Sequence, residues 1–185
     1  DEMNVVQGFL AAGHVCTIMG MDEYYPLVKK YKLPIVVTGF EPVDLLQGIL
    51  MLLKQLENGE CRLENQYTRF VKAEGNLDAK KIIQEVFVIA DREWRGIGNI
   101  PFSGYEVKNE YAAFDANKKF NIRLDKAEES KECIAGEILR GIKKPFECPQ
   151  FGKGCTPIKP IGAPMVSSEG ACAAYYNFSN MEAMA

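Results

Sequence analysis

The sequence predicts an α/β domain with a mostly parallel sheet, followed by a smaller domain that is rich in loops and helices. In the first half, short β-branched runs alternate with segments of helical periodicity, which is the pattern of strands joined by helices. A glycine-rich connector begins at Trp94, and prolines then punctuate a tail that carries four cysteines. We therefore expect an α/β domain over residues 1–109 and a cysteine-rich domain over residues 110–185.

Glycine and proline mark the first predicted elements. Residues 5–12 form an apolar run before Gly13, and this run predicts a buried strand. Residues 23–31 predict a short helix that ends before Pro34. The β-branched run at residues 35–39 ends in glycine, which is typical of a buried parallel strand.

Two helices and a weaker strand complete the predicted α/β domain. Residues 42–57 repeat apolar positions with a helical period until an Asn-Gly pair ends the helix. Residues 61–73 alternate loosely and suggest a strand. Asn76 is placed to cap a helix over residues 77–91. In such a domain, a polar site is expected at the carboxyl ends of the parallel strands.

The tail has few regular elements. A helix is expected at about residues 127–141, where helical periodicity returns after a polar and aromatic stretch. A second, short helix is expected near the end, over residues 170–176. Prolines and glycines between these two helices predict loops.

Composition argues against two classes of partner. The net charge is −3 and the isoelectric point is about 5.4, whereas a nucleic-acid-binding domain needs a basic face. No run approaches the roughly 20 apolar residues that span a bilayer. The acidic start resembles no export signal, so a reducing, cytoplasmic compartment is expected. In that compartment, six cysteines indicate metal ligands or redox groups more readily than disulfides.

Four cysteines form a candidate metal site in the pattern C-x14-C-x6-C-x16-C: Cys133, Cys148, Cys155 and Cys172. Four thiolates satisfy either a 4Fe–4S cluster or a tetrahedral zinc ion. The wide spacing favours the cluster, because structural zinc sites usually use cysteines only two to four residues apart. Disulfides and free structural thiols remain alternatives.

Three polar residues near the predicted strand ends are candidates for a site. His14 is the only histidine, and it suits a general base, a metal neighbour or a phosphate contact. A hydrogen-bonded structural histidine is an equal alternative. Glu41 and Asp44 lie where a strand ends and a helix starts, and Asp44 also favours a helix N-terminus electrostatically.

Three further residues have a functional and a structural interpretation. Glu169 lies three residues before Cys172, where it is either a proton relay or a surface carboxylate. Cys16 and Cys61 lie apart from the four tail cysteines, each inside a predicted structural segment. We expect both to be buried or partly buried free thiols.

The motifs that contain these residues resemble the HypD family of NiFe-hydrogenase maturation factors. The likeness runs over nearly the whole chain in the family's order, and its most specific piece is the tail from Met165 to Tyr176. The other motifs are Gly13-His14-Val15-x-Thr17-Ile18-x-Gly20, Gly39-Phe40-Glu41-Pro42-x-Asp44, Glu74-Gly75-Asn76, Asp91-x-x-Trp94-Arg95-Gly96-x-Gly98-x-Ile100-Pro101-x-Ser103-Gly104, and Cys148-Pro149-x-Phe151-Gly152 with Cys155-Thr156-Pro157.

The resemblance implies a redox-active maturation scaffold rather than a stand-alone enzyme. It implies two similar α/β domains and a third domain that holds a 4Fe–4S cluster. With a small HypC-like chaperone, such a protein carries a transient iron on which the Fe(CN)2CO group is built, and a HypE-like partner donates cyanide. By motif position, the cluster ligands correspond to Cys133, Cys148, Cys155 and Cys172.

The sequence also departs from the family pattern. The family's N-terminal half has an iron-binding cysteine and a Cys-Pro-Val-Cys redox motif, and neither is present here. The first residue is not Met, so we expect a piece of a longer product that resembles the C-terminal half and pairs with the N-terminal half. Cys16 replaces a residue that is usually Ser in the family. The alternatives are a structural zinc-binding interaction module and, less favoured, an enzyme with His14 as base and Glu41 as acid.

Overall fold

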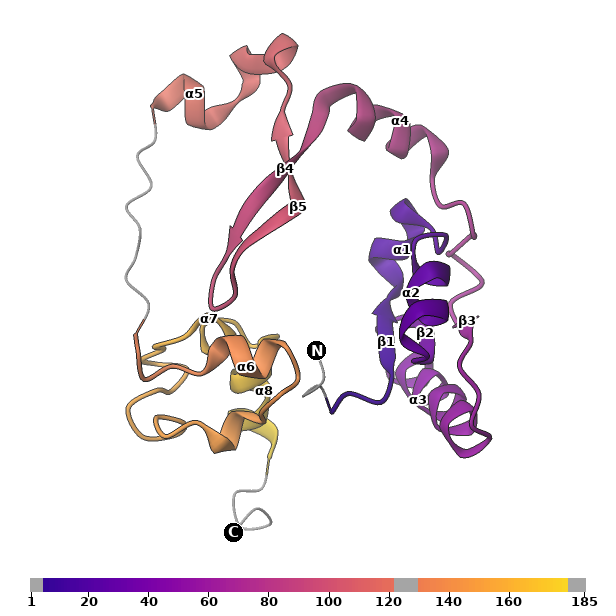
Figure 1. The fold of residues 1–185 in the computed structure, drawn as a ribbon, viewed down its shortest axis with the longest axis vertical. Coiled ribbons are helices and arrows are strands. Elements are labelled where there is room, and N and C mark those ends of the chain that lie inside the picture. Colours follow the sequence, from indigo (N-terminus) through magenta and orange to yellow (C-terminus); the bar gives the residue numbers. More distant parts are fainter. Residues whose placement is uncertain (1–4, 122–129, 180–185) are drawn as a thin grey trace. The chain divides into compact units, whose positions relative to one another are not determined.

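The computed structural model describes residues 5–121 and 130–179, which form two compact units (Figure 1). The first unit spans Val6–Val86, and the second begins at Phe87. A parallel sheet with helices organises the first unit, so the predicted α/β class is confirmed. The expected boundary between residues 109 and 110 stays a prediction.

The first unit is built around a parallel sheet of three strands in the order β1-β2-β3, namely β1 (Phe9–Ala12), β2 (Ile35–Thr38) and β3 (Leu63–Asn65). All four residues of the central strand β2 are buried, and its β-branched residues suit that position. The predicted burial of the first strand is wrong, because Phe9 and Leu10 are 44% and 38% exposed. In the described part of the chain, β1 has a strand on one side only, which explains this exposure.

Helices cover both faces of this sheet: α1 (Gly13–Met19), α2 (Tyr24–Tyr31), α3 (Pro42–Glu57) and α4 (Leu77–Val86) are the helices of the unit. Val37 and Thr38 point to opposite faces because they are neighbours in one strand. Val37 packs with Cys16 of α1. On the other face, a Cβ at Gly48 of α3 would lie 3.0 Å from the Cβ of Thr38. The helices α1 and α3 therefore sandwich β2.

Two elements of the first unit are shorter than predicted. The strand expected over residues 61–73 is limited to β3, and the helix expected over residues 77–91 ends at Val86. The predicted cap is confirmed, since Oδ1 of Asn76 accepts a hydrogen bond of 3.0 Å from the backbone N–H of Ala79. Beyond α4, the β-branched and aromatic run that begins at Phe87 pairs as a strand instead of continuing the helix.

An antiparallel hairpin opens the second unit and consists of β4 (Phe87–Trp94) and β5 (Gly98–Val107). Phe87 pairs with Val107 and Trp94 pairs with Gly98, so the ladder reaches the turn. The glycine-rich segment after Trp94, which was expected to be a connector, therefore forms the turn and part of the second strand of this hairpin. Glycine weakens a strand but does not prevent a strand from forming, because the hydrogen bonds between strands come from backbone groups. A 3-10 helix (Asn109–Phe114) and α5 (Ala116–Phe120) follow the hairpin.

Short helices and loops form the remainder of the second unit: α6 (Ala135–Leu139), a 3-10 helix (Pro145–Glu147), α7 (Ala163–Val166) and α8 (Ala171–Phe178). The helix predicted over residues 127–141 is confirmed only at α6, and residues 122–129 lie outside the described residues. The predicted terminal helix is confirmed as α8. Within residues 5–121 and 130–179, no helix combines the length and the apolar character needed to cross a bilayer.

Gln55 joins α3 to the segment that leads into β3. Its side chain is almost completely buried, with 1% exposure. The Gln55 Oε1 accepts a hydrogen bond of 2.7 Å from the backbone N–H of Arg62, and Nε2 donates one of 2.7 Å to Oε2 of Glu64. Because buried polar groups are costly when unpaired, this amide fixes how β3 meets α3.

Replacing Gln55 with Leu is expected to lower the free energy of unfolding by about 1–3 kcal/mol, since the backbone N–H of Arg62 loses its buried acceptor. Urea titration followed by circular dichroism measures the change. The matched control is Lys54→Leu, which alters an exposed position one residue away on the same helix. Equal stability of the two variants would show that the Gln55 amide does not fix this junction.

Candidate functional site

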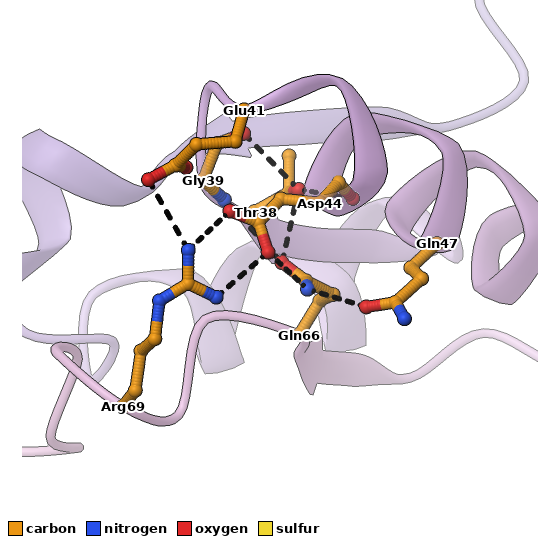
Figure 2. Close-up of polar contacts among 7 residues, drawn as sticks. All are labelled: Thr38, Gly39, Glu41, Asp44, Gln47, Gln66 and Arg69. Carbon is orange, nitrogen blue, oxygen red and sulfur yellow. Dashed lines mark hydrogen bonds and ion pairs between the residues drawn. The ribbon is translucent and has the colours of Figure 1, made fainter.

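The carboxyl ends of the strands carry a polar network, as predicted for a parallel sheet. The strand β2 ends at Thr38, and the chain then turns at Gly39 and Glu41 into α3. Figure 2 shows that side chains from this turn, from α3 and from the segment after β3 meet in one group. Asp44, in the first turn of α3, lies at its centre and is buried.

Arg69 binds both carboxylate oxygens of Asp44. Its Nη1 lies 2.8 Å from Oδ1 and its Nη2 lies 2.6 Å from Oδ2, a bidentate geometry (Figure 2). The Nη2 atom also lies 3.2 Å from Oε1 of Glu41. The hydrogen bonds from Arg69 hold the pKa of Asp44 well below its usual range, and the same contact raises the pKa of Arg69. Asp44 is therefore ionised at neutral pH.

Gln66 also forms a hydrogen bond with the carboxylate of Asp44. Its Nε2 donates hydrogen bonds of 2.8 Å to Oδ1 of Asp44 and to Oε1 of Gln47. The hydroxyl of Thr38 lies 2.9 Å from the backbone carbonyl oxygen of Asp44 and donates to it. These contacts tie β2, α3 and the segment after β3 into one rigid group. A carboxylate that is this fully paired suits a positioning role better than proton donation.

The other predicted residues at the strand ends are exposed. The ring of His14 packs on the ring of Phe40, with a centroid separation of 4.8 Å. Glu41 is exposed and contacts Arg69 as described above. The structure thus brings Glu41 and Asp44 together on one guanidinium and places His14 against an aromatic ring. Catalytic roles for these residues stay predictions.

Sequence reasoning missed Arg69 and Gln66. Both residues follow β3, so they lie at the carboxyl end of the third parallel strand, where ligands meet in such sheets. The rule that singled out Glu41 and Asp44 applies equally to them. Their importance was hidden because the third strand was expected to extend to residue 73, which placed both of them inside it.

Three of the four tail cysteines lie in or against one small core in the second unit. Cys155 and Cys172 are buried in this core together with Met165, and Cys148 packs against it. Burial and the nearby thiols of Cys155, Cys133 and Cys148 raise the pKa of Cys172 to about 11. None of the four forms a disulfide. Burial and repulsion from neighbouring thiolates therefore oppose the ionisation of Cys172.

Backbone groups also approach the sulfur atoms closely. The N–H of Ile161 donates a hydrogen bond of 3.3 Å to Sγ of Cys155. A Cβ on Gly162 would collide with Sγ of Cys133, so a larger residue at this position would require that sulfur to move. Within the described ranges, no three His, Cys, Asp or Glu side chains are arranged closely enough to hold a metal ion as they stand.

A cavity of about 50 Å³ lies beside Cys133. Small residues, among them Gly96, Ala135, Gly162 and Ala163, line it. The cavity is open enough to admit further atoms next to a thiol without moving a large side chain. The donor set, the glycine beside the sulfur and this free space are compatible with a metal–sulfur group.

The remaining predicted residues lie away from these groups. Cys16 is completely buried, and burial raises the pKa of its thiol, so the predicted buried free thiol is confirmed. Cys61 is also a free thiol, but the expected burial is wrong. It lies in the exposed loop after α3, where its Sγ donates a hydrogen bond of 2.9 Å to the carbonyl oxygen of Lys32. Glu169 is exposed in the turn before α8.

Replacing Arg69 with Gln is expected to destabilise the protein fully near pH 7, and the loss of stability becomes smaller only below about pH 4, so that part of it persists near pH 3. The depressed pKa of Asp44 means that its stabilising contribution is present above about pH 4, the unfolded value, and is lost as the pH falls toward the folded value. Urea midpoints at the two pH values measure this difference.

The matched control for this change is Arg62→Gln, which breaks an exposed ion pair with Glu60 in the same unit. It is expected to shift the urea midpoint little at either pH, because exposed pairs contribute little. An Arg69→Gln loss that is the same near pH 3 as near pH 7 would contradict the assignment of Asp44 as an ionised anchor.

Comparison with known proteins identifies relatives over nearly the whole chain. The HypD family model, described as the hydrogenase formation hypA family, matches residues 1–179. The hydrogenase maturation factor HypD1 of Bradyrhizobium diazoefficiens is 47% identical over 174 residues, which cover 94% of this chain and 46% of that protein. HypD of Azotobacter vinelandii is 45% identical with the same coverage. HypD of Rhodobacter capsulatus is 43% identical over 183 residues, covering 96% of this chain and 48% of that protein.

The chain therefore spans about half the length of the curated relatives that it matches, and the matched part is their C-terminal half. The match includes both units described above, because the family model extends from residue 1 to residue 179. The breadth of the match and the level of identity agree with the motifs found in the sequence. This chain belongs to the HypD family of hydrogenase maturation factors.

Proposed function

We propose that this chain holds a 4Fe–4S cluster on Cys133, Cys148, Cys155 and Cys172 and forms the electron-transfer end of a hydrogenase maturation scaffold. The observation that carries the proposal is that Cys148, Cys155 and Cys172 lie in or against one core, while Cys133 is near enough to raise the pKa of Cys172 and lines an adjacent cavity. A bound cluster supplies one-electron transfer. The loops of the second unit would hold the four sulfur atoms and exclude water from two of them.

Three features of the cysteine site favour a cluster over a single zinc ion. The ligands come from widely separated loops, whereas structural zinc usually sits between closely spaced cysteine pairs. The N–H of Ile161 already donates to a ligand sulfur, and hydrogen bonds of this kind help set cluster potentials. The cavity beside Cys133 offers space that a compact zinc site does not need.

The first unit is proposed to serve the assembly of the Fe(CN)2CO group in the whole protein. The relatives are named hydrogenase maturation factors. We infer a transient iron as cargo, a HypC-like chaperone and a HypE-like cyanide donor as partners, and a cytoplasmic setting. His14 and Glu41 are exposed at the strand ends and available to such partners, whereas Asp44 and Arg69 fix the local shape. Glu169 is the exposed carboxylate before Cys172.

We propose that the N-terminal half of the family's full-length proteins packs against the outer surface of α3. Exposed apolar residues on α3 follow the three-and-four spacing of a helix-packing seam: Val43, Leu46, Leu50 and Leu53 are each half exposed or more. An apolar helix face of this kind is typical of an interface. The chain spans about half of its relatives' length, so the other half is a natural occupant.

Anaerobic reconstitution with iron and sulfide tests the cluster. The wild-type chain is expected to bind about four irons with matching sulfide and to turn brown. Cys155→Ala is expected to lose most of this iron, because a buried ligand is removed from the core. Cys61→Ala is the control, since this exposed cysteine lies in the other unit. Full iron retention by Cys155→Ala would refute the proposal, and one zinc per chain in the freshly purified protein would support the zinc module instead.

A further inference from the structure

The turn of the β4–β5 hairpin touches the cysteine-rich core through backbone atoms. A Cβ on Gly136 of α6 would collide with the carbonyl oxygen of Gly96 in the turn. In the other direction, a Cβ on Gly96 would lie 3.1 Å from the backbone nitrogen of Gly136. Gly136 has no room for a larger residue and Gly96 has little, so two glycines from distant segments allow the turn and the helix to meet closely.

The hairpin holds this turn in a defined shape. The N–H of Ile97 donates a hydrogen bond of 3.0 Å to the carbonyl oxygen of Trp94, which closes the turn. The indole Nε1 of Trp94 donates a hydrogen bond of 2.7 Å to the hydroxyl of Ser103 on the opposite strand. Gly96 and Gly98 have φ angles of 81° and 93°, which favour glycine. The turn therefore meets α6 as a preformed element.

The same turn borders the cavity beside Cys133. Arg95 and Gly96 line one side of the cavity, and Cys133 and Gly162 line another. Cys133 is only partly buried, unlike Cys155 and Cys172, so its protection from solvent depends on what lies next to it. Solvent access is one of the properties that tune a metal–thiolate site.

We propose that the β4–β5 turn is a wall of the cysteine site, and that Gly96 and Gly136 are positioning residues whose contact keeps the turn over the Cys133 thiol. The wall limits access of small reagents to that sulfur. Its role in shielding a bound cluster rests on the proposed function, but the wall itself belongs to the metal-free chain. It extends the site beyond the cysteine-bearing loops to a hairpin that carries none of the ligands.

The test measures how fast N-ethylmaleimide modifies each cysteine of the reduced, metal-free full chain, with peptide mass spectrometry as the readout. Gly136→Ala and Gly96→Ala are each expected to accelerate modification of Cys133 several-fold. Gly98→Ala is the matched control, because it places the same strain in the same turn but its Cβ meets no atom within 4 Å. Cys61, which is exposed in the other unit, provides the reference rate.

Protection of Cys155 and Cys172 reports whether the core stays folded. If Gly136→Ala exposes them as well, Gly96→Ala decides the question, because that change lies outside the cysteine-bearing loops. Unchanged Cys133 rates in Gly96→Ala would overturn the proposal, and so would equal acceleration in Gly98→Ala. Because these rates are measured without metal, they are independent of whether the chain binds iron. In reconstituted protein, the same two variants are expected to lose visible absorbance faster to an iron chelator.

Discussion

The gathering of cysteine side chains in and around one small core is the constraint on which the second unit depends. Burial and mutual repulsion make it unfavourable for these sulfurs to ionise together, as the raised pKa of Cys172 shows. A metal–sulfur group would remove that penalty, because cations stabilise thiolates directly. In the proposed metal-bound form, metal binding and the packing of this unit would therefore depend on each other.

The first unit also contains a buried charge, and there a positively charged side chain compensates it. The buried carboxylate of Asp44 is neutralised by the bidentate guanidinium of Arg69 and by the amide of Gln66. A buried charge without such a partner is strongly destabilising. The pairing fixes the end of β2 against α3 and leaves His14 and Glu41 exposed beside it. At this end of the sheet, Asp44 is thus held by its side-chain partners, whereas His14 and Glu41 are accessible to solvent.

Local sequence signals predicted β2, α3 and α8, because each lies in a segment whose periodicity and boundary residues agree. The end of α4 was misjudged because the residues from Phe87 to Ala90 fit a helical stripe and a strand equally well, and their pairing with β5 is non-local. The spacing of the four cysteines could be recognised in the sequence. The partner of Asp44 and the contact between Gly96 and Gly136 could not be predicted, because each joins segments that are distant in sequence.

The central claim is that the four tail cysteines hold a cluster rather than a single metal ion. A Mössbauer spectrum of chain reconstituted with isotopically enriched iron tests it most directly. The account predicts one signal from irons that share sulfide and thiolate ligands, at about four irons per chain. A spectrum of one isolated iron with four thiolates, or a chain that takes up no iron, would contradict it.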